Sequence, residues 1–161
     1  MKNVIKIFTG KSLKTMIVEG GSAYWKLNKA RAAKCKYVLL VRNMHADWSE
    51  PDHPHGTAFL LGKVSGVTAA KDRFIIHFSE YALLNIPDSW DGSRNPVGYT
   101  DLNHENIDPE KLEWSPFPML AKTDKTTLSE NVQPLSLNDA KLGLAATFGI
   151  RPDQIEINIK A

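Results

Sequence analysis

The stretch from Gly20 to Asn43 combines aromatic rings with positive charge and contains no acidic residue. Tyr24 and Trp25 stand side by side, followed by the cations Lys26, Lys29, Arg31, Lys34, Lys36 and Arg42. Lysine and arginine neutralise phosphates, and a flat ring can stack on an unpaired base. We therefore expect the two rings and the three nearest cations to contact a nucleic acid or a nucleotide-like ligand. The alternative is that Trp25 fills the core while the cations form a solvated helix face.

A second aromatic segment, Trp90 to Tyr99, is dense in turn-forming residues. It places Arg94 and Asn95 between its two terminal rings. Aromatic walls with a guanidinium and an amide can recognise a planar heterocycle. We expect Trp90 and Tyr99 to stack on the ligand, Arg94 to contact a phosphate and Asn95 to contact a base edge. A rigid loop that the rings pin to the core is the alternative.

A polar loop at residues 43–56 carries three histidines and two aspartates, namely His45, Asp47, Asp52, His53 and His55. Imidazole and carboxylate groups are ligands for zinc and similar ions. A metal site at His45, His53 and His55 is therefore one interpretation of the loop. No established metal-binding spacing such as HExxH occurs, and a hydrated polar loop explains the same residues. We expect no metal and no cofactor.

Two short His-x-Thr/Ser elements, His55-Gly56-Thr57 and His77-Phe78-Ser79, allow an enzymatic alternative. Two-histidine phosphoesterases use a pair of such elements, with one imidazole as the base and the other as the acid. A small hydrolase would use His55 and His77 in these roles. His77 can equally be a core histidine with satisfied hydrogen bonds. Because no GxSxG elbow or phosphate-binding glycine loop is present, we favour binding over catalysis.

The elements that must position these side chains are mostly strands. Alternating or continuous apolar runs bounded by turn signals predict strands at 3–8, 14–18, 37–41, 57–67, 73–78 and 81–86. We expect a bulge at Gly62, where the missing side chain permits one. Asn28 is a predicted N-cap for a short helix that ends at Cys35, and Asp108-Pro109 begins another that ends near Trp114. The predicted fold is α+β, with a curved, mostly antiparallel sheet or small β-barrel.

The C-terminal part is predicted to be a separate helix-strand unit. We expect a β-rich domain at 1–120, a polar linker at 121–133 and a helix-strand appendage at 134–161 that docks on the domain, since it is too small to bury a core alone. Helical spacing, a capping box and a glycine stop involve Ser136, Leu137, Asp139, Ala140, Leu144, Phe148 and Gly149. The strand would contain Ile155, Ile157 and Ile159. Its edge suggests a protein-interaction module as a third functional alternative.

Composition narrows the class of protein without identifying it. The 161 residues are 42% apolar and 24% charged, which is ordinary for a globular protein, and the net charge of +2 does not by itself imply a nucleic-acid or membrane partner. A single cysteine, Cys35, excludes an intramolecular disulfide. No apolar run approaches the roughly 18 residues of a membrane span, so we expect a cytoplasmic protein. The sequence leaves the oligomeric state open.

Several of these segments resemble PUA-like domains of the EVE and ASCH kind. The similarity covers residues 20–100 and involves Tyr24-Trp25, the short helix after it, the strand YVLLVRN and the glycine-broken strand AFLLGKVSGV. It implies a compact β-barrel with helices and a pocket between barrel and loops that binds RNA or modified DNA bases. The C-terminal segment resembles the helix-strand ends of uncharacterised bacterial proteins, which implies a bacterial source.

Overall fold

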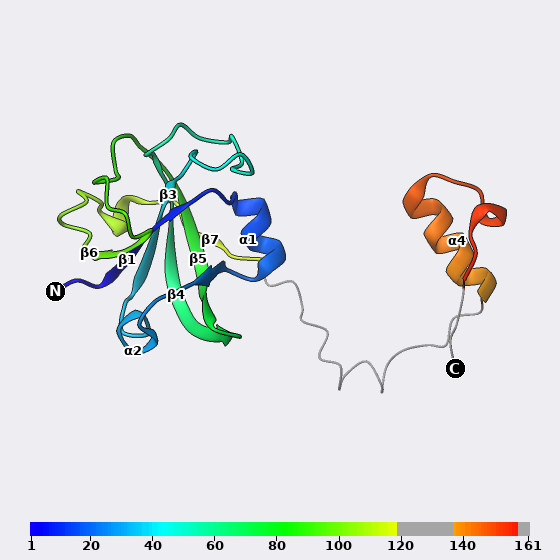
Figure 1. Ribbon diagram of the computed structural model, residues 1–161, viewed down its shortest axis with the longest axis horizontal. Helices are drawn as coiled ribbons and strands as arrows, with labels where there is room; N and C mark the ends of the chain where they lie inside the picture. Colours follow the sequence, from blue (N-terminus) through cyan, green and yellow to red (C-terminus); the bar gives the residue numbers. More distant parts are fainter. Residues whose placement is uncertain (119–136, 158–161) are drawn as a thin grey trace. The chain divides into compact units, whose positions relative to one another are not determined.

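The computed structural model describes residues 1–118 and 137–157, and the chain divides into two compact units, Met1–Leu120 and Ala121–Ala161. The first unit contains a curled sheet with two short helices (Figure 1). Its elements are β1 (Val4–Thr9), α1 (Leu13–Glu19), β2 (Ser22–Trp25), α2 (Lys29–Ala32), β3 (Tyr37–Arg42), β4 (Ala58–Ala70), β5 (Arg73–Ile86), β6 (Val97–Thr100), η1 (Pro109–Lys111) and β7 (Ser115–Pro116).

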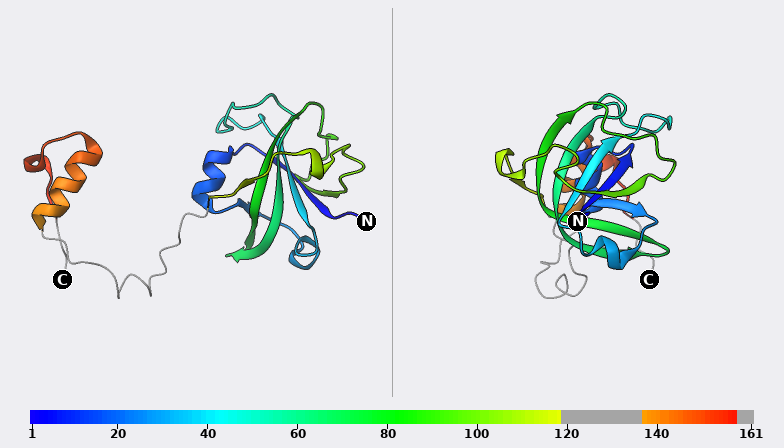
Figure 2. Two further views of the ribbon diagram at one scale, coloured as in Figure 1. Left: turned by 180° about the vertical axis from the view of Figure 1, so that it is seen from behind. Right: turned by 90° about the vertical axis from the view of Figure 1, so that its left-hand side faces the viewer.

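The strand order in this sheet is β2-β5-β4-β3-β1-β6, and β7 pairs with β5. β1 and β3 are parallel, whereas the other pairings among the described residues are antiparallel. Register shifts interrupt the long β4–β5 hairpin, and such bulges increase the local twist of a sheet. Figure 2 shows the resulting half-barrel from the side. The expected α+β class with a strongly curved, mostly antiparallel sheet is confirmed.

Apolar side chains cover both faces of the central strands. Successive residues of a strand point to opposite faces, so Val38 and Leu40 of β3 enter one core layer while Leu39 and Val41 enter the other. The helices contribute Met16 and Ala32 to the first layer. The chain after β6 contributes to the second, through Leu102 and Ile107. This arrangement explains why β1 and β3 contain nearly continuous apolar runs.

The strand predicted at 14–18 is wrong, because these residues belong to helix α1. The Ser12 side chain accepts a hydrogen bond from the Thr15 N–H and caps the start of the helix. Gly20 ends the helix in the left-handed conformation, with φ of 80°. Both capping signals flank the run KTMIV, but its apolar residues suit either a strand or a helix. The caps therefore decide the conformation.

The helix predicted from Asp108 to Trp114 is limited to the 3₁₀ turn η1. Leu112 is already extended, and the indole of Trp114 donates a hydrogen bond to the Pro109 carbonyl, which closes the segment before β7 begins. The N-cap role of Asn28 is confirmed, although α2 ends at Ala32 rather than at Cys35.

Gly62 does not form the expected bulge, since it pairs in regular register with Val38 and Tyr81. The shifts of β4 occur on either side of it. Gly62 instead provides space: a Cβ atom at this position would lie 2.8 Å from Cγ of Phe78 and 3.0 Å from a methyl group of Val38. The buried Phe78 ring therefore packs directly on the backbone of β4.

In the second unit, Gly149, which has a φ of 65°, directly follows α4 (Leu137–Phe148) and stops the helix. The 3₁₀ turn η2 (Pro152–Gln154) comes next. The predicted face of α4 is exposed at Leu137, Leu144 and Phe148. Residues 155–157 do not form the expected strand. The predicted cap at Ser136, the linker at 121–133 and Ile159 lie outside the described residues.

Replacing Gly62 with alanine is predicted to destabilise the first unit by about 1–3 kcal/mol, because the added methyl group overpacks the core against Phe78. The matched control is Gly66→Ala on the same strand, where an added Cβ meets no atom within 4 Å. Urea unfolding followed by tryptophan fluorescence measures both, since all four tryptophans precede residue 120. Equal destabilisation by the two substitutions would contradict the packing role of Gly62.

Candidate ligand-binding site

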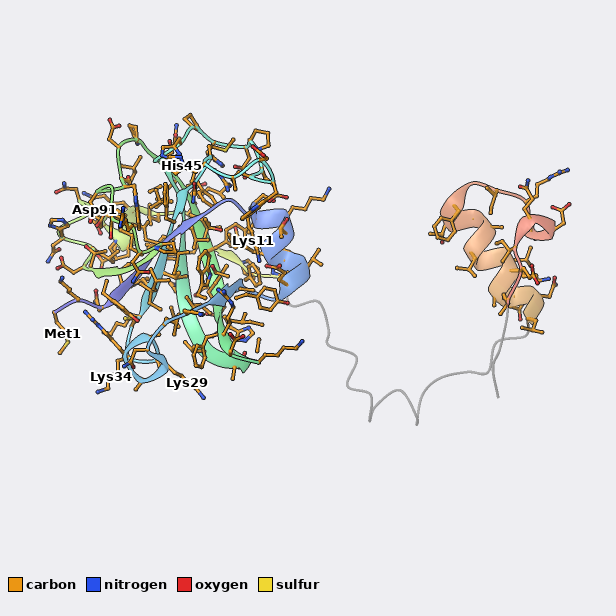
Figure 3. All side chains as sticks on the ribbon, in the orientation of Figure 1. Met1, Lys11, Lys29, Lys34, His45 and Asp91 are labelled. Atoms are coloured by element: carbon orange, nitrogen blue, oxygen red, sulfur yellow. The ribbon has the colours of Figure 1, made fainter. Side chains whose placement is uncertain are left out.

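The aromatic and basic residues highlighted by the sequence do not all gather in one place. Figure 3 shows Lys29 and Lys34 of the α2 region at one end of the first unit and His45 at the other. Lys26 and Lys29 are exposed. The basic helix and the histidine loop therefore cannot contact the same small ligand.

Trp25 is half-buried against the first core layer, and its indole N–H donates to Oγ of Ser22 at 2.9 Å. Tyr24 is exposed, and its φ of 71° is unusual for a residue other than glycine. The ammonium group of Lys11 lies 4.9 Å from the Tyr24 ring centroid. Trp25 thus packs largely as the core alternative predicted, and neither ring lines the hollows described below.

Tyr99 and Arg31 form a cation–π pair, with the guanidinium 3.9 Å from the ring centroid. Burial raises the pKa of the Tyr99 phenol above its ordinary value, the neighbouring Cys35 adds to the shift, and the charge of Arg31 opposes it. Tyr99 also lines a hollow of about 280 Å³ together with Trp90. Two of the predicted stacking residues therefore border one hollow, but the Tyr99 ring packs against the first core layer and the Trp90 ring against the second. Trp25 is not part of this hollow.

The densest group of rings in the described structure surrounds a different cavity. Phe8 and Trp90 stack with centroids 4.4 Å apart and planes 7° from parallel. The His55 ring packs edge-on against Phe8 at 5.2 Å and against His45 at 4.4 Å. The cavity beside them has a volume of about 570 Å³, within the usual range for small-molecule sites. We call it the ring pocket; its further lining residues include Asn43, Asp88 and Arg94.

Backbone hydrogen bonds join the three segments that form the ring pocket. The N–H of Gly56 donates to the carbonyl of Arg42 at 2.9 Å, and the N–H of Ser89 donates to the carbonyl of Gly56 at 2.8 Å. The N–H of Phe8 donates to the carbonyl of Pro96 at 2.8 Å. The histidine loop and the turn-rich segment after β5 are thereby fixed to the ends of β1 and β3.

Hydrogen bonds also fix the polar character of several pocket side chains. Nδ1 of His55 accepts the Met44 N–H at 3.1 Å, so the neutral imidazole carries its proton on Nε2 and presents a donor there. Oδ1 of Asn43 accepts the His45 N–H at 2.9 Å, which leaves the amide nitrogen of Asn43 as a donor. Asp88 and Arg94 have no hydrogen-bond or ion-pair partner within residues 1–118 and 137–157.

Asn95, which was predicted to contact a base edge, has a structural role in the folded protein. Its Oδ1 accepts the Val97 N–H at 3.1 Å and stabilises the turn that leads into β6. The side chain is exposed beside the ring pocket but is not among its lining residues. The amide nitrogen of Asn95 stays available as a donor to a ligand.

Arg42 is fully buried at the base of the histidine loop. Its guanidinium donates to the carbonyls of Thr9 and Lys11, each at 3.0 Å, and forms an ion pair with Asp52. It lies 4.3 Å from the centroid of the Phe59 ring. Burial lowers the pKa of Arg42, and the charge of Asp52 opposes this shift. In the sequence Arg42 looks like one more cation of the basic stretch.

Glu50 attaches the same loop to the start of α1. Its carboxylate accepts hydrogen bonds from the Ser12 N–H and, at 2.7 Å, from the Thr15 hydroxyl. Burial alone would raise the pKa of Glu50, but these hydrogen bonds and the charge of Arg42 outweigh it and lower the pKa. The folded protein therefore favours the ionised form of Glu50.

The three loop histidines do not converge on a metal position. His53 stacks on Phe59 with centroids 5.1 Å apart, and its Nδ1 lies 3.1 Å from Asp52, away from the contact between His45 and His55. Within the described parts of the chain, no group of three or more histidine, cysteine, aspartate or glutamate side chains could hold a metal ion. The donor set of the metal alternative does not fit.

The geometry also opposes a catalytic pair formed by His55 and His77. Both nitrogens of His77 are hydrogen-bonded at 2.7 Å, Nδ1 to the Gly20 carbonyl and Nε2 to the Thr68 hydroxyl. His77 and Ile86 are nine residues apart on β5. Ile86 pairs with Ala58, which follows His55 closely in the chain. The step from His77 to Ile86 spans roughly 30 Å of extended strand. The two imidazoles cannot act on one substrate atom.

A larger hollow of about 860 Å³ lies between the start of β3 and the chain after β6. Tyr37 is its one aromatic lining residue, and the carboxylates of Asp101 and Asp108 are engaged with the N–H groups of His104 and Glu110. The ring pocket combines several rings with unpaired polar groups, which are features of a binding site rather than of a surface groove. It is therefore the better candidate despite its smaller volume.

Comparisons with protein-family models, with curated proteins and with solved structures found no match for this chain. No helix within the described residues is long and apolar enough to cross a membrane.

Removing the Asp52 carboxylate by Asp52→Ala is predicted to reduce the unfolding free energy by about 2–3 kcal/mol, because the buried guanidinium of Arg42 loses its counter-charge. Glu80→Ala is the matched control. It breaks the ion pair with Lys63, in which both side chains are more than one third exposed, and should cost less than about 1 kcal/mol. Denaturant unfolding measures both. Similar values for the two variants would contradict the anchoring role of Arg42.

The lowered pKa of Glu50 predicts an acid-dependent contribution to stability. Ionised Glu50 stabilises the fold above its ordinary pKa of 4.5, and this contribution is lost as the pH falls through the lower folded-state value. Glu50→Gln should therefore reduce the unfolding free energy at pH 7 and have a smaller effect near pH 3. Urea titrations between these pH values test this, with exposed Glu113→Gln as the control. A pH-independent effect of Glu50→Gln would contradict the account.

Proposed function

We propose that this protein is a non-enzymatic binding module for a nucleobase, presented by a nucleotide or by single-stranded nucleic acid. The observation that carries the proposal is the ring pocket, in which four aromatic side chains surround a cavity bordered by polar groups that have no partner in the described structure. Flat rings bind bases of any sequence by stacking. A cavity of this volume suits a ligand the size of a nucleotide.

Arg94 is the proposed phosphate contact at this site. It is exposed, lines the ring pocket and has no acidic partner in the part of the chain that the structure describes. Arginine is well suited to this role because its planar guanidinium presents paired donors to phosphate oxygens. In this arrangement the Trp90 indole contacts the base, while Arg94 from the same loop contacts the backbone or the nucleotide phosphate.

A longer strand would extend from the ring pocket toward α2. Trp90 lines both the ring pocket and the smaller hollow that it shares with Tyr99, and Arg31 lies on the Tyr99 ring. A further phosphate of the strand has a cation available there, at Arg31. Beyond Arg31, the exposed residues Lys26 and Lys29 are proposed as outer phosphate contacts.

The PUA-like resemblance remains part of this proposal. A strongly curled sheet with a pocket formed by the loops at one end is compatible with the barrel and base pocket that the resemblance implies. The proposed base site uses Trp90 and the histidine loop rather than Tyr24 and Trp25.

Binding of a fluorescein-labelled single-stranded oligonucleotide, followed by anisotropy at several salt concentrations, tests the proposal. Trp90→Ala should weaken binding at least about fivefold through the loss of stacking. Arg94→Ala should reduce the slope of log affinity against log salt by about one, because one phosphate contact is lost. The charge-matched control is Lys14→Ala, since Lys14 is exposed on α1 outside the three hollows.

Absence of binding at low salt by the unmodified protein, to oligonucleotides and to mononucleotides alike, would overturn the proposal. It would also be contradicted if Lys14→Ala weakened binding as much as Arg94→Ala. Circular dichroism of each variant ensures that only folded protein is compared.

A further inference from the structure

Hydrogen bonds within the protein determine which ring-pocket side chains can donate to a ligand and which can accept from it. The backbone N–H of Met44 makes His55 a donor at Nε2, and the backbone N–H of His45 occupies one lone pair of the Asn43 carbonyl oxygen and leaves its amide nitrogen free to donate. Both side chains are therefore donors toward a ligand. Asp88, which also lines the pocket, supplies a carboxylate and can only accept. Trp90 is not available as a donor, since its indole N–H is engaged with the Ser93 carbonyl at 3.3 Å.

These roles disfavour one common way of recognising adenine. An asparagine recognises adenine by accepting from N6 and donating to N7 at the same time. Oδ1 of Asn43 already accepts the His45 N–H, so only its second lone pair remains for such a contact, whereas its amide nitrogen is free to donate. With Arg94 assigned to a phosphate, the donors of His55 and Asn43 match acceptors on the base, and the Asp88 carboxylate matches donors.

Guanine carries groups that match this pattern. Its O6 and N7 are adjacent acceptors. Its N1–H and 2-amino group are adjacent donors on the other side of O6, and the two oxygens of one carboxylate can accept from both. Adenine has an amino group in place of O6 and an unprotonated N1, so it offers the carboxylate one donor and places an acceptor beside it.

The backbone conformation at Asp88 indicates that this carboxylate is held in place at the pocket. Asp88 has a φ of 53°, a left-handed conformation that is uncommon outside glycine. The turn is held by the hydrogen bonds of Ser89, from its hydroxyl to the Ile86 carbonyl at 2.8 Å and from its N–H to the Gly56 carbonyl. The carboxylate itself has no partner among the residues that the structure describes. A firmly held turn thus presents an unpaired acceptor at the pocket.

We infer that the ring pocket is selective for guanine-type bases, with His55 and Asn43 donating to O6 and N7 and Asp88 accepting from N1–H and the 2-amino group. The inference rests on the proposed function and adds the class of base. It makes Asp88 the specificity-determining residue, while the rings contribute affinity that every base shares.

Isothermal titration of the full chain with GMP, AMP and xanthosine monophosphate tests the inference. The unmodified protein should bind GMP at least about tenfold more tightly than AMP, because a well-placed bidentate contact discriminates between bases by about this factor or more. Xanthosine monophosphate should bind weakly, since its C2 carbonyl would face the Asp88 carboxylate.

Asp88→Asn provides the decisive variant. Asparagine tolerates the left-handed backbone, so the turn should be preserved. Its amide can accept from N1–H and donate to a C2 carbonyl, so the preference should change from GMP to xanthosine monophosphate. Asp91→Asn is the matched control: Asp91 is three residues away, lines the smaller hollow and uses Oδ1 to accept the Ser93 N–H. It should retain the preference for GMP.

The outcomes separate the two proposals. If AMP binds as tightly as GMP, or if Asp88→Asn leaves the GMP preference unchanged, guanine selectivity is overturned while base binding stands. If neither these nucleotides nor oligonucleotides bind, the proposed function fails and the selectivity fails with it.

Discussion

The burial of one guanidinium group is the constraint on which the candidate site depends. A cation removed from water costs several kcal/mol unless its surroundings compensate for it. Arg42 is compensated by Asp52, by two backbone carbonyls and by the Phe59 ring, so the loop that carries Asp52 is held against the sheet. The carbonyl of the same arginine accepts the Gly56 N–H, and Gly56 in turn accepts the Ser89 N–H. The histidine loop and the opposite pocket wall therefore depend on the same buried residue.

This anchoring holds the loop and its side chains in place before any ligand binds. A loop of this length would ordinarily lose conformational entropy on binding a ligand, and preorganisation reduces that loss. Backbone N–H groups at Met44 and His45 also fix the roles of His55 and Asn43. The pocket thus differs from a general aromatic patch, because its rings supply stacking surface while backbone geometry determines which hydrogen bonds a ligand must complete.

The longer strands β1, β3, β4 and β5 were predictable from the sequence, since apolar runs such as 37–41 are buried on both faces of the sheet. The short strands β2, β6 and β7 were not predicted, because they are only two to four residues long. The conformation of 14–18 was not, because its apolar spacing suits a helix or a strand and the caps at Ser12 and Gly20 decide between them. Residue type also could not distinguish Trp25, which packs against the first core layer and lines no hollow, from Trp90, which packs against the second core layer and also lines the pocket. The contact of Trp90 with Phe8 depends on long-range pairing that no local pattern encodes.

Chemical-shift mapping of the ¹⁵N-labelled protein with GMP tests the central claim most directly, because it locates the ligand without assuming its site. The account predicts that the largest changes occur at the residues that border the ring pocket, at 43–45, 55–56 and 88–96. Changes concentrated on α2 and the neighbouring Tyr24-Trp25 segment, with the ring-pocket residues unaffected, would contradict it. In that case the basic stretch, rather than the loops held by Arg42, would be the binding surface.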